Sequence, residues 1–266
     1  LVTTMPCKVI PVPALQDNYM YLIIDEATKK AGVVDPVDVD AIQKAASENG
    51  AIIDCILTTH HHWDHDGGNI KLTEQCTSIT EVYGGKGDNA DAVTKEVGDG
   101  DEFMIGETPV RVLFTPCHTP GHVCYFVGSK HVFTGDTMFV SGCGNFNSGT
   151  PQQMTDAFDK ILSLPDDTSV WVGHEYTHKN CKFAHFAEPA NEEAKARLEW
   201  AASQGSMHSG GQGTIPSTIS DEKKCNPFAR IDAQDIIKFC GDASDRAERM
   251  RLVRKGKDDW GVKTNL

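Results

Sequence analysis

The first 180 residues alternate between short apolar runs and clusters of turn residues. Apolar runs bounded by turn residues predict strands, and here they cover residues 8–13, 19–25, 31–34, 52–58, 110–115, 123–127, 131–134 and 170–173. Two segments with helical spacing, 39–49 and 151–163, lie among them. The first is followed by Gly50, which is typical of helix ends, and the second opens with the cap-forming pair Thr150-Pro151. Strands interleaved with helices predict an α/β fold.

The pattern changes near residue 180. Helical spacing then dominates, and it predicts helices at residues 188–202, 232–240 and 244–255. The connection 205–224 is rich in Gly and Ser and contains Pro216, so we expect a loop there. We therefore predict two parts, a mixed α/β catalytic domain over residues 1–180 and a helical C-terminal domain over residues 181–266.

Charge is distributed unevenly along the chain. The formal net charge is −13. Residues 1–180 carry 11 basic and 25 acidic side chains, whereas residues 181–266 carry 14 and 13. Such an acidic protein is not expected to bind nucleic acid, and no apolar run approaches the roughly 20 residues of a membrane span. Six basic residues within 246–257 predict a local site for a small anion.

The cysteine content indicates the redox environment. Nine cysteines, an odd number without a repeating framework, predict reduced thiols in a cytosol-like compartment. We see no secretory signal pattern and expect the natural start at Met5. We therefore expect a cytoplasmic protein, with a mitochondrial form left open. Separately, we expect a monomer.

The densest group of reactive side chains directly follows the predicted strand 52–58. Within six positions the chain places four metal-binding side chains: His60, His62, Asp64 and His65. Ligands that follow a strand are held by a rigid element. His61 alternates away from its histidine neighbours, so we do not expect it to be a ligand. His122, in a later turn, is expected to be a structural partner.

Three more metal-binding side chains follow other predicted strands: His118, Asp136 and His174. One four-coordinate ion would leave several of the seven groups unexplained. Two ions use all of them if a carboxylate bridges, and Asp136 is the natural bridge because a carboxylate has two oxygens. Nitrogen and oxygen ligands suit Zn²⁺, and Fe or Mn fit nearly as well. The sequence therefore predicts two metal ions per chain.

Several motifs carry a family resemblance. They are ALQDNYMY (14–21), TTHHHWDH (58–65), GCG (142–144), GHEYT (173–177) and NPFAR (226–230). Together they resemble the metallo-β-lactamase superfamily and, more closely, its glyoxalase II or hydroxyacylglutathione hydrolase family. The similarity runs from about residue 8 to about residue 258, nearly the whole chain.

This resemblance implies a four-layer αββα sandwich with a C-terminal helical domain. It also implies two ligand sets joined by Asp136: His60, His62, His118 and Asp136 for one metal, and Asp64, His65, His174 and Asp136 for the other. The expected catalytic residues are His60, His62, Asp64, His65 and Asp136. The implied reaction is hydrolysis of S-D-lactoylglutathione to D-lactate and glutathione, the second step of methylglyoxal detoxification.

The same resemblance implies a binding site for glutathione. The family uses a Tyr, an Arg and a Lys at the positions of Tyr176, Arg254 and Lys257. It usually has a basic residue at the position of Asn145 and an aromatic residue at that of Asn147. Asn donates hydrogen bonds but supplies no cation, so we expect weaker glutathione binding or a different thiol.

Other activities remain open at this stage. Within the superfamily, a β-lactamase or lactonase would not need the C-terminal helices or the GHEYT motif. A glutathione persulfide dioxygenase would hold one iron, and its second ligand set would be absent or unused. A thioesterase for another thiol and a non-enzymatic scaffold complete the alternatives. Metal content separates most of these: two ions for a hydrolase, one iron for a dioxygenase, none for an inactive scaffold.

Overall fold

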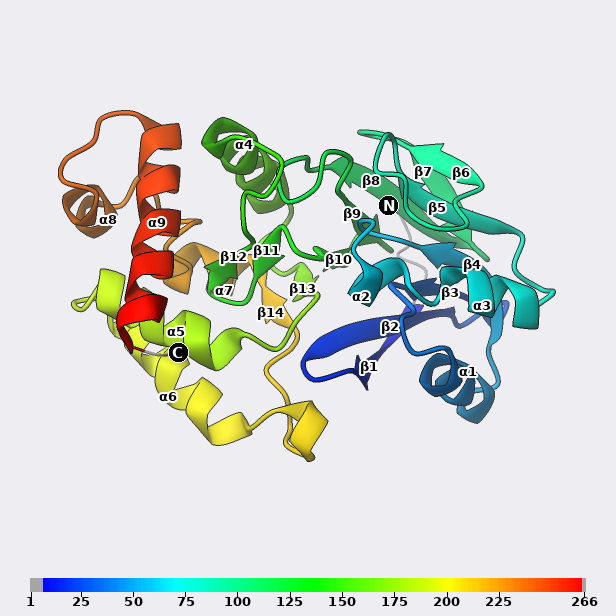
Figure 1. Cartoon of the computed structure of the whole chain (residues 1–266). Coiled ribbons are helices and arrows are strands. Elements are labelled where there is room, and N and C mark those ends of the chain that lie inside the picture. Colours follow the sequence, from blue (N-terminus) through cyan, green and yellow to red (C-terminus); the bar gives the residue numbers. More distant parts are fainter. Residues whose placement is uncertain (1–6, 265–266) are drawn as a thin grey trace.

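Two mixed six-stranded sheets form the centre of the protein, which a computed structural model describes over residues 7–264 (Figure 1). Residues 1–6 and 265–266 lie outside the described residues, and with them the expected start at Met5. The first sheet has the strands in sequence order: β1 (Cys7–Ala14), β2 (Asn18–Asp25), β3 (Lys30–Val34), β4 (Ile52–Leu57), β5 (Glu81–Gly85) and β6 (Lys95–Val97). Its first three strands are antiparallel and the rest run parallel.

The second sheet has the order β14-β13-β10-β9-β8-β7. Its strands are β7 (Glu102–Ile105), β8 (Thr108–Phe114), β9 (Val123–Val127), β10 (His131–Phe133), β13 (Ser169–Trp171) and β14 (Ser217–Thr218). Within it, β10 and β13 are parallel, and the other pairs are antiparallel. A small hairpin of β11 (Met138–Phe139) and β12 (Gly142–Cys143) follows β10.

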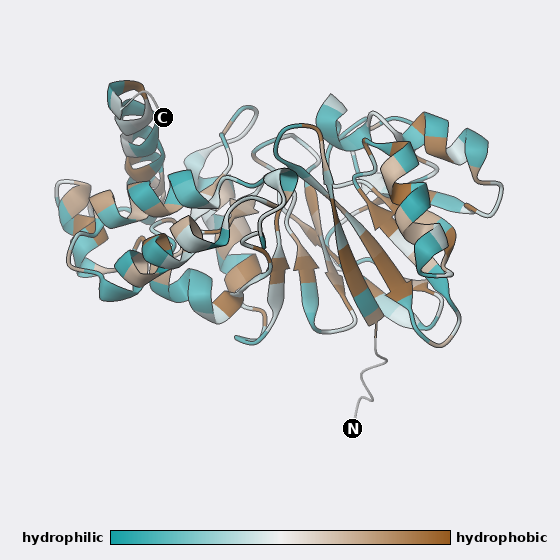
Figure 2. Cartoon of the chain, turned by 90° about the horizontal axis from the view of Figure 1, so that it is seen from below, coloured by the Kyte–Doolittle hydropathy of each residue, from teal (hydrophilic) through white to brown (hydrophobic). Residues whose placement is uncertain are grey.

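Helices cover the outer faces of both sheets, which gives the four-layer αββα sandwich. On the first sheet lie α1 (Val39–Glu48) and α3 (Asn69–Gln75), and on the second lies α4 (Pro151–Leu162). Strand β2 shows why the layers form, because all eight of its residues are buried. Tyr21 and Ile23 face the second sheet, whereas Leu22 faces α1, as the two-residue period of a strand requires. Figure 2 shows apolar positions concentrated on the strands between the helices.

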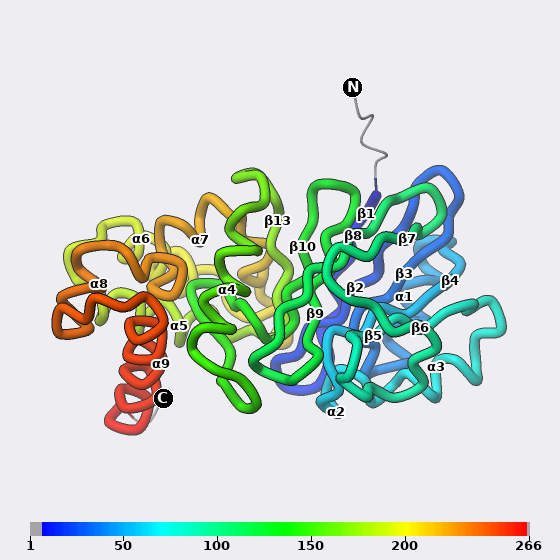
Figure 3. The backbone as a smooth tube through the Cα atoms, turned by 90° about the horizontal axis from the view of Figure 1, so that it is seen from above, coloured from blue at the N-terminus to red at the C-terminus, as the bar shows by residue number. Residues whose placement is uncertain are grey.

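The C-terminal helices pack beyond α4, on the side away from the first sheet (Figure 3). They are α5 (Thr177–Ala187), α6 (Glu192–Gln204), α7 (Ile219–Cys225), α8 (Gln234–Phe239) and α9 (Arg246–Thr264). Apolar residues of α5, α7, α8 and α9 join the same core cluster as α4 and the second sheet. Helix α5 spans residue 180, and the division of the chain there stays a prediction. None of the helices over residues 7–264 is long and apolar enough to cross a membrane.

The structure confirms the eight predicted strands and the first two helices to within two residues at each end. It also corrects the C-terminal part. The helix predicted at 188–202 begins four residues later, because Asn191 caps it with its side chain. The loop predicted at 205–224 contains β14 and most of α7, and α9 extends nine residues past 255. Strands β5, β6 and β7 and helices α3 and α5 were not predicted.

Candidate metal centre and substrate cavity

The topology brings four strand ends to one edge of the sandwich. Strands β8 and β10 are both antiparallel to β9, and β13 is parallel to β10, so these three strands end on the same side. The loop after β4 meets them there, where the backbone N–H of Val123 donates to Thr59 O at 3.0 Å. The N–H of Gly173 donates to Gly135 O at 3.0 Å, which joins two of the loops. The predicted ligands therefore converge.

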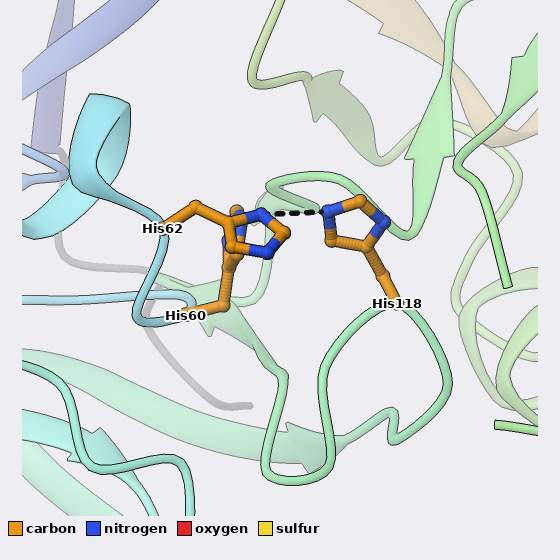
Figure 4. A group of neighbouring side chains, drawn as sticks. All are labelled: His60, His62 and His118. Carbon is orange, nitrogen blue, oxygen red and sulfur yellow. Dashed lines mark hydrogen bonds between the residues drawn. The ribbon is translucent and has the colours of Figure 1, made fainter. Parts of the chain in front are cut away.

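Three imidazoles form the first ligand group. His60 and His62 come from the loop after β4, and His118 comes from the loop after β8. His62 Nδ1 lies 3.0 Å from His60 Nε2 and 3.1 Å from His118 Nε2. Figure 4 shows the rings turned toward one another from the two loops. Their ligand atoms lie close enough together to hold one ion.

The second group comprises Asp64, His65 and His174. Asp64 and His65 belong to the short helix α2 (Trp63–Asp66), and His174 follows β13. His174 Nε2 lies 3.2 Å from His65 Nε2 and 3.3 Å from Asp64 Oδ2. These atoms also meet the spacing of a metal site.

Asp136 lies between the two groups. Its Oδ2 is 3.5 Å from His118 Nε2, and its Oδ1 is 3.4 Å from His65 Nε2 and 3.5 Å from His174 Nε2. Each oxygen thus faces a different group. Oδ1 is buried and has no hydrogen-bond partner among the described residues. An orphaned buried carboxylate oxygen of this kind fits a bridging metal ligand.

The tautomers of the histidines also fit bound cations. The Nδ1 atoms of His65, His118 and His174 face pure acceptors: Asp35 Oδ2 at 2.9 Å, Asn145 O at 3.0 Å and Asp17 Oδ1 at 2.8 Å. Each Nδ1 therefore donates, and in the neutral ring each Nε2 lone pair points inward. Lone pairs 3.2 Å apart repel unless a cation lies between them. The donor set therefore fits metal ions.

The pKa shifts within the site also fit bound cations. Burial and the neighbouring imidazoles hold the pKa of His60 well below its usual range, which keeps it neutral. Burial alone would lower the pKa of His174, but the carboxylates of Asp136, Asp17 and Asp64 raise it to about 9. A hydrogen bond from His174 lowers the pKa of Asp64. A proton takes the place of a cation when no metal is bound.

Asp35 was missed by sequence reasoning. It is buried, accepts from His65, and also accepts from Thr59 Oγ1 at 2.8 Å. Because the Thr59 hydroxyl donates to Asp35, it accepts from His60 Nδ1, 3.0 Å away. One carboxylate thus orients two ligands. Its only sequence signal is that it directly follows β3.

Asp88 was also missed, and it ties the loops of the three-histidine group together. Its carboxylate accepts from the backbone N–H of His61 at 2.5 Å and of Gly121 at 3.0 Å. His61 itself turns away from the ligands toward Asp88, as expected. His122 is the expected structural partner, because its Nε2 accepts from the backbone N–H of Asp136 at 3.2 Å.

A cavity of about 620 Å³ opens beside His118 and Asp136. Four of the five predicted substrate contacts line it: Asn145, Tyr176, Arg254 and Lys257. Asn147 is exposed and is not among the described lining residues. Lys179 and Asn180 of α5 also line the cavity and were not predicted, because α5 itself was not.

The two predicted cations are held by nearby oxygens. Lys257 is only 8% exposed and donates to Asn180 Oδ1 at 2.5 Å. Burial, together with the neighbouring Arg254, lowers the pKa of Lys257 to about 7. Arg254 Nη1 donates to Cys143 O at 2.7 Å, and Asp258 accepts from its Nη2. The cavity therefore offers positive charge next to the metal centre.

Burial makes the cysteines near this site poor nucleophiles. All nine cysteines are free thiols, in agreement with the sequence prediction. Cys117 and Cys143 lie near the ligands, but burial raises the pKa of each to about 12. Thiols this weakly acidic are protonated near neutral pH.

Comparisons with known proteins agree with the fold and the site. Residues 16–174 match the metallo-beta-lactamase superfamily, the class that the sandwich and its histidine–aspartate centre define. Residues 175–260 match the hydroxyacylglutathione hydrolase C-terminus. The chain belongs to the hydroxyacylglutathione hydrolase family of this superfamily.

Individual relatives cover nearly the whole chain. A cytoplasmic hydroxyacylglutathione hydrolase of Arabidopsis thaliana is 45% identical over 260 residues, 95% of this chain and 99% of its own. A hydroxyacylglutathione hydrolase-like protein of Gallus gallus is 40% identical over 263 residues, 96% of this chain and 90% of its own. The crystal structure of ETHE1 from Myxococcus xanthus superposes with a TM-score of 0.67 at 26% identity, covering 94% of this chain and 90% of that one.

Proposed function

We propose that this protein is a binuclear metal-dependent thioester hydrolase that converts S-D-lactoylglutathione to D-lactate and glutathione, the second step of methylglyoxal detoxification. The observation that carries the proposal is the pair of ligand groups joined by Asp136, beside a cavity that contains Arg254 and Lys257. The names of the Arabidopsis and Gallus relatives support a glutathione thioester as the substrate.

The chemistry needs no protein nucleophile. Metal ions in such a site lower the pKa of water and polarise a carbonyl oxygen. We assign the seven ligands as the catalytic centre, with Asp64 held toward it by Asn18, whose Nδ2 donates to Asp64 Oδ2 at 3.0 Å. A thiol with a pKa of about 8.5 leaves as thiolate without a dedicated acid. Cys117 and Cys143 are buried and protonated, in agreement with a reaction that needs no protein nucleophile.

We assign binding of the thiol part to the first cavity. Glutathione is anionic, and Arg254 and Lys257 supply positive charge there. Tyr176 also lines this cavity, and its ring is held beside the metal ligand His174, with ring centroids 4.8 Å apart. Asn145 contributes a donor at the cavity wall, and the exposed Asn147 is assigned only a peripheral contact.

Finer features belong to the same proposal. We propose zinc as the metal, because imidazole nitrogens and carboxylate oxygens form the ligand set. We propose a cytoplasmic monomer, with support for its location from the name of the Arabidopsis relative. The division into catalytic residues 1–180 and helical residues 181–266 is proposed as well.

The direct test is hydrolysis of S-D-lactoylglutathione by purified protein, with and without chelator pretreatment. We expect turnover that the chelator abolishes and added metal restores. Absence of turnover at full metal content would overturn the proposal. Thioesters of other thiols would then test a different leaving group, and oxygen consumption with glutathione persulfide would test the dioxygenase alternative.

A further inference from the structure

A second cavity, of about 460 Å³, reaches the metal centre at a different place. The first cavity meets the centre at His118 and Asp136, whereas the second meets it at Asp64 and His174. Tyr176 lines both cavities. A thioester has two parts on either side of its carbonyl carbon, and the centre has one cavity for each.

The second cavity is lined by two apolar side chains that are exposed rather than packed in the core. Leu15 is 49% exposed and Trp63 is 68% exposed. Neighbouring exposed apolar residues in a concave surface indicate a binding site. Leu15 also has a φ of 50°, in the left-handed region that Leu rarely adopts. Strain of this kind gathers at functional sites.

Trp63 is placed by the metal ligands on either side of it. It is the first residue of α2, between His62 and Asp64. Its indole packs against Gly67, where a Cβ would lie 3.1 Å from Trp63 Cδ1. The ring is therefore held at the edge of the centre while most of its surface stays open to a ligand.

The second cavity is lined by the carboxylates of Asp17 and Asp64, whereas the lining of the first includes the basic side chains of Lys179, Arg254 and Lys257. Asp17 accepts from His174, and Asp64 accepts from Asn18, so both are held in place at the wall of the second cavity. Although metal ions would bind on the Asp64 side, an anionic group entering here would face the Asp17 carboxylate with no Lys or Arg among the described lining residues.

We propose that this second cavity binds the acyl part of the thioester and selects neutral acyl groups with apolar, including aromatic, side chains. The inference rests on the proposed function, because it takes the substrate to be a glutathione thioester. The anionic thiol part then lies with Arg254 and Lys257, and the acyl side chain lies between Leu15 and Trp63. Acyl selectivity is set by these two residues.

The test compares three S-acylglutathiones that differ in one group. They carry D-lactoyl, D-phenyllactoyl and D-malyl, which add a phenyl ring or a carboxylate to the lactoyl methyl. For the unaltered protein we expect kcat/KM for phenyllactoyl at least equal to that for lactoyl, and a value about tenfold lower for malyl. In W63A and L15A, the ratio of phenyllactoyl to lactoyl kcat/KM should fall about tenfold, the worth of a lost aromatic or apolar contact.

Two controls keep the outcome clear. Ile70, equally exposed at 49% but in α3, gives the matched variant I70A, which should keep the ratio unchanged. Metal analysis of each variant shows whether the centre is intact, and L15A changes a residue distant in sequence from the ligand run. Equal loss for phenyllactoyl and lactoyl, or malyl as good a substrate as lactoyl, would overturn the inference. No hydrolysis of any of the three by the fully metallated protein would instead overturn the proposed function.

Discussion

Gly173 lies between two ligands of the metal centre. A Cβ at this position would come 2.5 Å from Asp136 Oδ1 and 2.9 Å from His65 Cε1. We therefore expect G173A to displace the bridging carboxylate, to bind less than two metals per chain, and to lose about 100-fold in kcat. Gly98 provides the control, because its nearest atom would be 3.8 Å away and G98A should behave as the unaltered protein. Elemental analysis with steady-state kinetics measures both, and full metal content in G173A would contradict the account.

The buried Lys257 should make substrate binding depend on pH. Its pKa of about 7 in the folded protein lies below the ordinary lysine value of 10.5, so the ammonium loses its charge as pH rises through 7. The KM for S-D-lactoylglutathione should rise over this range, while the free energy of unfolding gains from the same group between about pH 7 and 10.5. K257M should raise KM about tenfold at pH 6 and remove the change near pH 7.

The control for this prediction lies two residues away. Lys255 is on the same helix, but it is exposed and pairs with Asp259. K255M should therefore keep both the KM and its pH dependence. A KM of the unaltered protein that stays constant from pH 6 to pH 8.5 would show that Lys257 does not bind the substrate as a cation.

Individual residues also show how far the sequence predicts the site. All seven predicted ligands meet, because each follows an apolar strand and the strands end at one edge. Asp35 and Asp88 act through contacts with distant loops, and a single sequence carries no sign of those pairings. Asn180 was missed because the buried face of its helix includes the polar residues Thr177 and Asn180, so the apolar pattern along the sequence is weak.

At the scale of elements, the strands buried on both faces were easiest to predict. Strand β2 presents eight consecutive buried residues, which form a distinct apolar run. Strand β6 has three residues, two of them exposed, and β5 contains two glycines. Such strands exist because neighbouring strands pair with them, so a local pattern does not reveal them. The predicted start of α6 was too early because the cap at Asn191, rather than the apolar spacing, determines where the helix begins.

Asp88 joins the two loops that carry the three-histidine group. Removal of the carboxylate leaves the N–H groups of His61 and Gly121 without their acceptor, so the loops that carry His60, His62 and His118 should separate. D88A should therefore bind about one metal instead of two after dialysis, with at least tenfold lower metal affinity. The control D54A removes a carboxylate that pairs with Lys30 at 3.1 Å. Two retained metals in D88A would contradict the role of Asp88.

Across the whole molecule, the second sheet, α4 and the C-terminal helices α5, α7, α8 and α9 share one core cluster. Phe183 is fully buried within it, with ring contacts to Phe228, Phe239 and Trp260. We expect one cooperative unfolding transition for the metal-free protein. F183A should shift this whole transition, with a loss of about 3–5 kcal/mol. Calorimetry that shows a separate C-terminal transition, moved alone by F183A, would contradict a shared core.

Two metal ions are expected to act together at the centre that the whole fold positions. The most direct test is the titration of chelator-stripped protein with Zn²⁺ while S-D-lactoylglutathione hydrolysis is followed. We expect kcat/KM to rise until two equivalents per chain are bound and then to stay constant. A plateau at one equivalent, or hydrolysis that does not depend on metal, would contradict this expectation.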